Sequence, residues 1–132
     1  MSIAGSAWSR TCIVALAAAS IVSGAAAQST TTDTRPYDEK LLRLTEILGA
    51  VHYLRELCGA NDGQMWRDRM KEMMDTEGSS ALRRAKLTRS FNNGYRSYSR
   101  TYNVCSQSAQ TAINRFLAEG AEIADSLVKS AP

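Results

Sequence analysis

Apolar residues recur at every third or fourth position along the C-terminal part of the chain, over nearly three heptads. The positions are Ala109, Ile113, Phe116, Gly120, Ile123 and Leu127. Steps that alternate between four and three match the repeat of an α-helix and place these residues on one face. A helix with one apolar face must cover it with other elements, so the pattern predicts a helix packed within a larger helical assembly. Ser106 or Ser108 is placed to cap its N-terminus.

Two earlier segments show the same helical spacing. The first runs over 37–58 and is followed by Gly59, a residue typical of helix C-termini. The second begins after Asn61 or Asp62, both good N-terminal caps, and ends near 77. Amphipathic helices that are joined by short connections must bury their apolar stripes against one another.

A third segment, over 81–103, carries an aromatic stripe and a possible interruption. The triplet Asn92-Asn93-Gly94 is also found in hairpin turns, but the stripe keeps its phase on both sides of it. We therefore predict one helix with a weak middle, and no strand anywhere in the chain. The sequence predicts an all-α fold, a small four-helix bundle with one disulfide, formed by a single helical domain over 37–132. The stripe consists of Leu87, Phe91, Tyr95, Tyr98 and Tyr102.

Residues 1–27 have the organisation of a Sec signal peptide. Arg10 supplies a positive charge, 11–22 is apolar, and Ala25-Ala26-Ala27 forms a small-residue cleavage site. An uncleaved membrane anchor is the alternative, but the apolar run is shorter than the roughly 18–20 residues that a spanning helix needs. We expect cleavage after Ala27, a flexible leader over 28–36, no membrane span after cleavage, and localisation in the periplasm.

Removal of the signal leaves two cysteines, Cys58 and Cys105, in a compartment where disulfides persist. We expect one internal bond between them, which would contribute roughly 4 kcal/mol by closing a long loop. Two free buried thiols or an intermolecular bridge are the alternatives. The bond would join the end of the first predicted helix to the junction before the last.

Positive charge is unevenly distributed along the chain. The full sequence has 16 Lys and Arg against 13 Asp and Glu, yet residues 78–118 contain no acid and seven bases. On a helical wheel, most of these bases lie opposite the aromatic stripe, which predicts a basic outer face. We expect this face to bind an anionic partner; the alternative is a solvated face balanced by the acidic first two helices. The candidate binding residues are Lys86, Arg89, Asn93, Arg96 and Arg100.

Features of enzymes are scarce. The chain has one histidine, His52, and with Glu56 it offers two metal ligands at most, where a catalytic zinc needs three. The single S-x-x-K match at Ser126 lacks the companion motifs of serine acyl-enzymes. We expect no catalytic residues, no metal and no cofactor, with His52 a packed residue. Trp66 is expected to anchor the core, and Arg55, within an apolar stripe, to pair with Asp62 or Asp68.

Several short motifs together resemble an uncharacterised family of short exported alphaproteobacterial proteins, a domain-of-unknown-function family. The resemblance covers roughly 36–128, implies a Gram-negative periplasm, supports pairing of Cys58 with Cys105, and assigns no activity. The motifs are His52-Tyr53-Leu54-Arg55-Glu56-Leu57-Cys58-Gly59, Trp66-Arg67 with Met70, Phe91-Asn92-Asn93-Gly94-Tyr95-Arg96, Tyr102 with Cys105, and 108–120.

Compartment and charge together suggest a function. We expect a non-enzymatic periplasmic envelope factor that binds peptidoglycan or an envelope-assembly protein through the basic face, in cell-wall growth or division. Nucleic acid is not an expected partner of an exported protein. The alternatives are a small periplasmic chaperone or stress protein, and an inhibitor or adaptor of an envelope enzyme. The sequence does not predict the oligomeric state.

Overall fold

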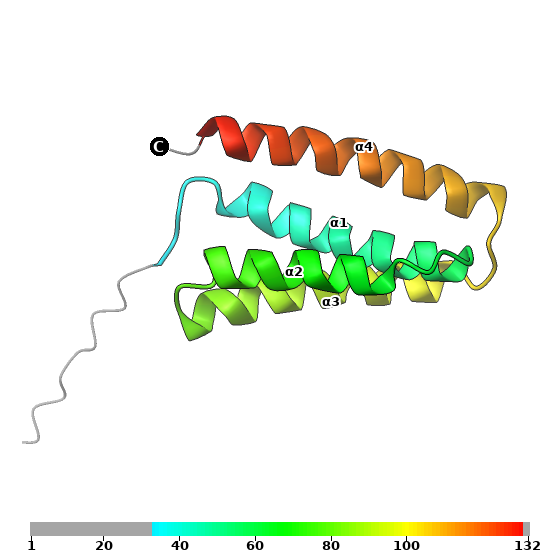
Figure 1. Ribbon diagram of the computed structural model, residues 1–132, viewed down its shortest axis with the longest axis horizontal. Helices are drawn as coiled ribbons and strands as arrows, with labels where there is room; N and C mark the ends of the chain where they lie inside the picture. Colours follow the sequence, from blue (N-terminus) through cyan, green and yellow to red (C-terminus); the bar gives the residue numbers. More distant parts are fainter. Residues whose placement is uncertain (1–32, 131–132) are drawn as a thin grey trace, which may run out of the picture. The chain divides into compact units, whose positions relative to one another are not determined.

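The computed structural model describes residues 33–130. The predicted signal peptide and residues 28–32 of the predicted leader lie outside the described residues. Four helices form the described chain, without a strand: α1 (Asp38–Leu57), α2 (Gly63–Glu77), α3 (Ala81–Thr101) and α4 (Gln107–Ser130) (Figure 1). The predicted all-α fold, a four-helix bundle with one disulfide, is confirmed, and the predicted helix ends lie within two residues of the observed ones.

The helix ends follow from local capping. Ser80 Oγ accepts a hydrogen bond of 3.1 Å from the backbone N–H of Arg83, and Ser106 Oγ accepts one of 3.2 Å from Ala109 N–H. Each satisfies a donor that the first turn of a helix leaves without a partner. Gly59 adopts a φ of 80° directly after α1, a left-handed conformation that suits glycine.

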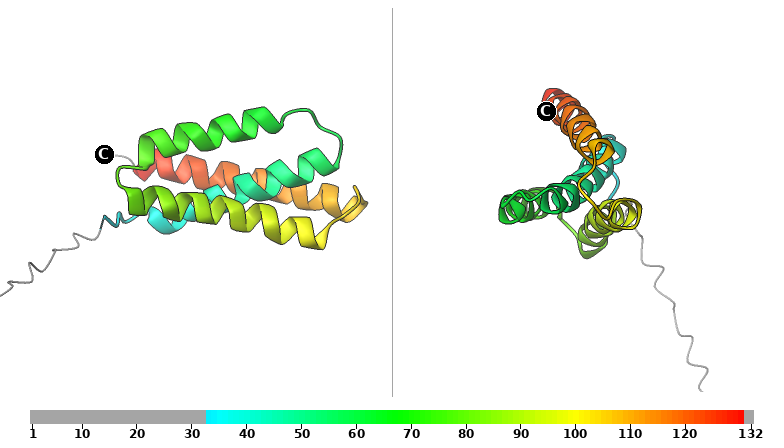
Figure 2. Two further views of the ribbon diagram at one scale, coloured as in Figure 1. Left: turned by 90° about the horizontal axis from the view of Figure 1, so that it is seen from below. Right: turned by 90° about the vertical axis from the view of Figure 1, so that its right-hand side faces the viewer.

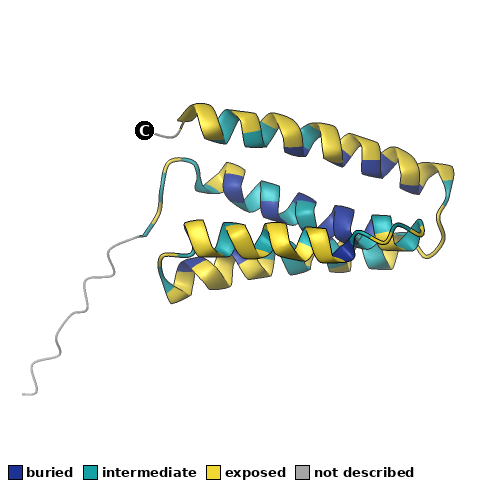
Figure 3. Ribbon diagram, viewed as in Figure 1, coloured by how far each residue is buried: buried dark blue, intermediate teal, exposed yellow. Residues whose placement is uncertain are grey.

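Helix α1 lies at the centre of the bundle. It packs against α2, α3 and α4, whereas the backbone of α4 approaches that of α1 alone among the other described helices. Figure 3 shows the buried residues concentrated on α1 and on the sides of α3 and α4 that face it. The two helices α2 and α4 therefore stand apart on either side of α1, as the end-on view in Figure 2 shows.

The apolar seam of α4 faces this central helix. The prediction that the seam packs within the helical assembly is confirmed. Phe116 is 1% exposed, and the ring of Tyr98 meets its ring edge-on at 4.9 Å between centroids. Ile123 and Leu127, at the C-terminal end of the seam, are only half-buried. The seam thus packs most tightly in its first half.

Helix α3 runs through Asn92-Asn93-Gly94 without interruption, which confirms the prediction of one continuous helix. Gly94 is buried against the backbone of α1, and Ser90 Oγ donates a 2.6 Å hydrogen bond to the carbonyl oxygen of Leu42. The glycine in the triplet therefore serves a close helix crossing.

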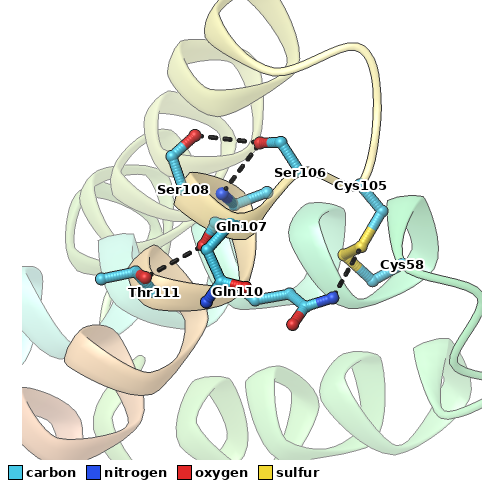
Figure 4. Close-up of a disulfide and its surroundings, with 8 residues drawn as sticks. Cys58, Cys105, Ser106, Gln107, Ser108, Gln110 and Thr111 are labelled. Carbon is cyan, nitrogen blue, oxygen red and sulfur yellow. Dashed lines mark hydrogen bonds between the residues drawn. A yellow bond between two sulfur atoms is a disulfide. The ribbon is translucent and has the colours of Figure 1, made fainter.

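A disulfide joins Cys58 to Cys105, with their Cα atoms 4.9 Å apart (Figure 4). It links the end of α1 to the connection between α3 and α4, as the sequence predicts. The side-chain N–H of Gln110 donates to Cys105 Sγ at 3.7 Å, and Ser106 caps α4 next to it. The bond thus holds the start of α4 against the end of the central helix.

Ion pairs fix the described start of the chain to the turn between α2 and α3. Arg35 NH1 lies 2.9 Å from Glu77 Oε2, and Ser79 Oγ donates a 3.1 Å hydrogen bond to Asp33 Oδ2. Residues 33–36, the described part of the predicted leader, therefore make specific contacts with the domain. None of the four described helices combines the length and apolar character needed to span a membrane.

Candidate functional site

The five candidate binding residues lie on the outer face of α3, and all are exposed. Their spacing along the helix is three, four, three and four residues, which places each one beside the next on the surface. We call this set, Lys86, Arg89, Asn93, Arg96 and Arg100, the basic stripe. With a rise of 1.5 Å per residue, the stripe extends about 21 Å along the helix.

Like charges are neighbours within the basic stripe. Lys86 and Arg89 are three residues apart, and Arg96 and Arg100 are four apart. Pairs of like charge at these spacings destabilise a helix by about 0.2–0.5 kcal/mol each. The arrangement therefore costs stability in the free protein, and an anionic partner would offset that cost.

The acidic side chains of α1 and α2 do not neutralise the basic stripe. On α1, Glu46 pairs with Arg43 at 2.9 Å and Asp62, just beyond it, with Arg55. The acids of α2 pair mostly within their own helix. Glu72 contacts Arg69 at 2.9 Å and Asp75 contacts Lys71 at 2.6 Å.

None of the four cations of the basic stripe forms an ion pair with any residue in 33–130. The structure thus brings the predicted site residues together on one face and leaves their charges available. No described acid lies within ion-pair distance of these four cations, although Asp38 and Glu39 line a small pocket together with Lys86.

Arg83 is different from the other bases of the acid-free segment and requires a correction to the charge count. Its guanidinium is 4% exposed and lies 2.6 Å from Asp38 Oδ1 and 3.1 Å from Glu77 Oε2. Arg84 donates to the carbonyl oxygens of Met74 and Gly78. The segment therefore presents less free positive charge than its sequence suggests, because Asp38 of α1 and Glu77 at the end of α2 fold onto Arg83.

An apolar groove of about 540 Å³ runs between α2 and α4, with α1 as its floor. Its α1 residues include Leu44 and Leu48, and its α2 wall includes Trp66 and Met73. Sequence reasoning missed this groove. A signal was present, because the α4 wall contains Leu117, Ala121, Ala124 and Val128, which repeat the 4-3-4 spacing of the buried seam with an offset.

Trp66 and Arg55 make the contacts that the sequence predicts for them. Trp66 is half-buried and packs against the core, and its indole Nε1 is buried without an acceptor among the described residues. Arg55 pairs with Asp62, one of the two predicted partners, while Asp68 accepts a hydrogen bond from Gln64. Asp62, one of the two predicted candidates, is the N-cap residue of α2, but its side chain makes no capping hydrogen bond.

His52 is a packed residue, as predicted. It is 6% exposed and its ring lies 6.0 Å from that of Phe91 and 5.5 Å from that of Tyr95, between centroids. Burial lowers the pKa of the imidazole, although Glu56 Oε1, 3.8 Å from Nε2, acts in the opposite direction. Within the described part of the chain, no three His, Cys, Asp or Glu side chains gather in a way that could hold a metal ion.

Comparisons with known proteins place the domain in a family. Residues 36–130 match the model of a family described as "Protein of unknown function (DUF2385)". Neither the comparison with curated proteins nor the comparison with solved structures finds a match. The matched residues span all four helices, both bonded cysteines and the whole basic stripe. The chain therefore belongs to the DUF2385 family.

Proposed function

We propose that this protein is a non-enzymatic periplasmic envelope factor that binds an anionic cell-wall partner through the basic stripe. The partner is peptidoglycan or an envelope-assembly protein, and the process is cell-wall growth or division. The observation that carries the proposal is the exposure of four cations along one helix face without an ion pair among residues 33–130.

The chemistry of the stripe suits carboxylates. Arg89, Arg96 and Arg100 each offer a planar guanidinium fork that matches the two oxygens of a carboxylate. Asn93, in the middle of the stripe, adds a neutral side chain that can both donate and accept hydrogen bonds. Peptide stems of peptidoglycan present repeated carboxylates, and the row of three forks, about 16 Å long from Arg89 to Arg100, would meet several of them.

The periplasmic location rests on residues 1–27, whose pattern is that of a signal peptide. The Cys58–Cys105 disulfide is consistent with an oxidising compartment. In that compartment, cell-wall carboxylates are an abundant polyanion. The predicted export of the protein and the positive charge of the basic stripe thus both support a cell-wall partner that carries carboxylates.

Pelleting of the protein with purified sacculi tests the proposal. We expect the parent to pellet and its binding to weaken as salt rises, because exposed charges are screened over about 8–10 Å at physiological ionic strength. The triple variant Arg89→Gln, Arg96→Gln, Arg100→Gln should lose most of this binding while its melting temperature stays close to that of the parent.

The matched control removes the same charge from other surfaces. Arg67 and Lys71 on α2 and Lys129 on α4 have side chains that are 60%, 74% and 73% exposed, and none of them lines the apolar groove. Their joint replacement by Gln should leave sacculus binding nearly unchanged. Equal losses in the two triple variants would show that net charge alone drives binding, and would reject the stripe as a site.

The alternative functions make a different prediction in the same assay. A chaperone, or an inhibitor or adaptor of an envelope enzyme, has no reason to bind purified sacculi in a salt-dependent manner. Absence of pelleting at low salt would therefore reject the peptidoglycan partner. Capture of an acidic envelope protein that depends on the same three arginines would then support an envelope-assembly protein as the partner of the basic stripe.

A further inference from the structure

The groove between α2 and α4 has no uncompensated charge. Its three charged lining residues are Arg69, Glu72 and Glu77. Arg69 pairs with Glu72 at 2.9 Å, and Glu77 is held by Arg35 and Arg83. The remaining lining is almost entirely apolar, so an occupant of the groove must itself be uncharged and apolar. The anionic partner proposed for the basic stripe does not fit here.

One wall of the groove is a ridge of small and aliphatic residues on α4. Leu117 is 38% exposed and Val128 is 76% exposed, although both are apolar. Between them, Ala121 and Ala124 leave the helix backbone accessible to close approach. We call this set, Leu117, Ala121, Ala124 and Val128, the α4 ridge.

The spacing of the α4 ridge is symmetric about its own centre. The steps are four, three and four, so the midpoint of Leu117 and Val128 coincides with the midpoint of Ala121 and Ala124. A two-fold axis through that point would pair Leu117 with Val128 of the second copy and Ala121 with its Ala124. Two-fold interfaces require this kind of self-complementarity.

We propose that the groove is the interface of a homodimer, in which α4 of a second copy lies antiparallel along the α4 ridge. Thirteen of the eighteen lining residues are half-buried or exposed and have surface that a second copy would cover. A standard stable interface has roughly 20–30 residues per side, so residues that flank the groove would supply the rest. With this axis, no charged residue of α4 lies opposite a like charge, because Glu122 faces Ile123 and Asp125 faces Gly120.

The dimer has a consequence that rests on the proposed function. No residue of α3 lines the groove, so both basic stripes remain accessible in the dimer. Two stripes on one particle would bind a repeating polymer with higher avidity than one, because the second contact is intramolecular.

Sedimentation velocity of the full chain across the micromolar range tests the interface. We expect the parent to have twice the monomer mass. The variant Ala121→Glu, which places a charge on the α4 ridge, should weaken dimerisation by about tenfold or more. Its matched control is Ala118→Glu, because Ala118 is an exposed alanine of the same helix that does not line the groove. This control should remain a dimer.

Two substitutions of opposite charge test whether Leu117 of one copy lies opposite Val128 of the other. Leu117→Lys and Val128→Glu should each weaken the dimer, and the double variant should restore it, since each lysine would meet a glutamate of the other copy. The positions are eleven residues apart in one helix, about 16 Å, so they cannot pair within one chain. Val104→Glu, at a valine that is 64% exposed outside the groove, is the control for a charge at an exposed valine.

Three outcomes would overturn the proposal. The first is a monomeric parent, which would leave the groove to an apolar ligand or another protein. The second is equal association of the Ala121→Glu variant and the parent, which would place the interface elsewhere. The third is failure of the double variant to associate more strongly than either single variant while circular dichroism shows all three folded. Because the readout is mass, the result is independent of sacculus binding.

Discussion

Gly49 and Gly94 meet where α1 crosses α3, and neither position has room for a side chain. A Cβ added at Gly49 would lie 1.9 Å from the carbonyl oxygen of Phe91, and one added at Gly94 would lie 1.9 Å from that of Glu46. The obstructing atoms belong to the two backbones, which cannot move without separating the helices. The two glycines thus permit an approach that no other pair of residues allows.

Substitution of either glycine should therefore reverse the usual effect of alanine in a helix. Gly→Ala commonly stabilises a helix interior by about 0.5–1 kcal/mol, whereas we expect Gly94→Ala to lower the free energy of unfolding by about 2–4 kcal/mol through overpacking. Urea denaturation measures this change. Gly120→Ala is the control, because its Cβ would meet only the side chains of Ile47 and Leu44, at 3.4 and 3.7 Å. A neutral Gly94→Ala would mean that the helices do not cross so closely.

Arg83 and Arg84 are neighbours in sequence with opposite structural roles. Loss of Arg83 leaves the carboxylate of Asp38 without its buried partner, while Glu77 keeps its ion pair with Arg35, and breaking a buried pair costs about 3–5 kcal/mol. We expect Arg83→Met to reduce stability within or just below that range, and Arg84→Met, on an exposed side chain, to change it by less than about 1 kcal/mol. Thermal denaturation of the two variants should differ clearly; equal melting temperatures would contradict the ion-pair network.

The disulfide should contribute strongly to stability. Cys58→Ser opens a link between residues 47 apart in sequence, and we expect a loss of roughly 3–4 kcal/mol. The native protein should show no free thiol until it is reduced. Under reducing conditions the parent and the variant should unfold at nearly the same urea concentration, and a difference that persists there would point to another cause.

Burial differs along the seam of α4, and the cost of truncation should follow it. Phe116 is 1% exposed and contacts Tyr98, so Phe116→Ala should cost about 3–5 kcal/mol. Ile123 is half-buried, and Ile123→Ala should cost about 1–2 kcal/mol. Chemical denaturation of both variants checks the order. A larger loss at Ile123 would mean that the C-terminal half of α4 is packed more tightly than described.

His52 should make stability depend on pH. Because burial lowers its folded-state pKa below the unfolded value of about 6.5, the unfolded chain binds the proton first and stability falls as the pH drops through that value. Glu56 opposes this shift and Arg67, from α2, adds to it. Urea denaturation at about pH 7.5 and about pH 5.5 should show a smaller loss for His52→Gln than for the parent. An equal loss would assign the pH dependence to carboxylates alone.

Local sequence determines the four helices and much of the site. Ser80 and Ser106 cap helices because their hydroxyl groups need only the next turn of the chain, and Gly59 ends α1 through its own backbone conformation. The basic stripe could likewise be placed from spacing alone, since residues three and four apart share a helix face wherever the helix lies.

Tertiary structure decides which of these features remain available to a partner. In the sequence, Arg83 is one of seven bases in a segment without acids. In the fold, Asp38 and Glu77 neutralise Arg83, because α1 and the end of α2 meet at this side chain. The close crossing at Gly49 and Gly94 depends on two segments 45 residues apart. The groove exists because the backbone of α1 approaches those of α2 and α4, while the backbones of α2 and α4 do not approach each other within the described chain. Periodicity fixes which face of a helix is apolar, whereas only the packing of all four helices determines how much of that face is covered.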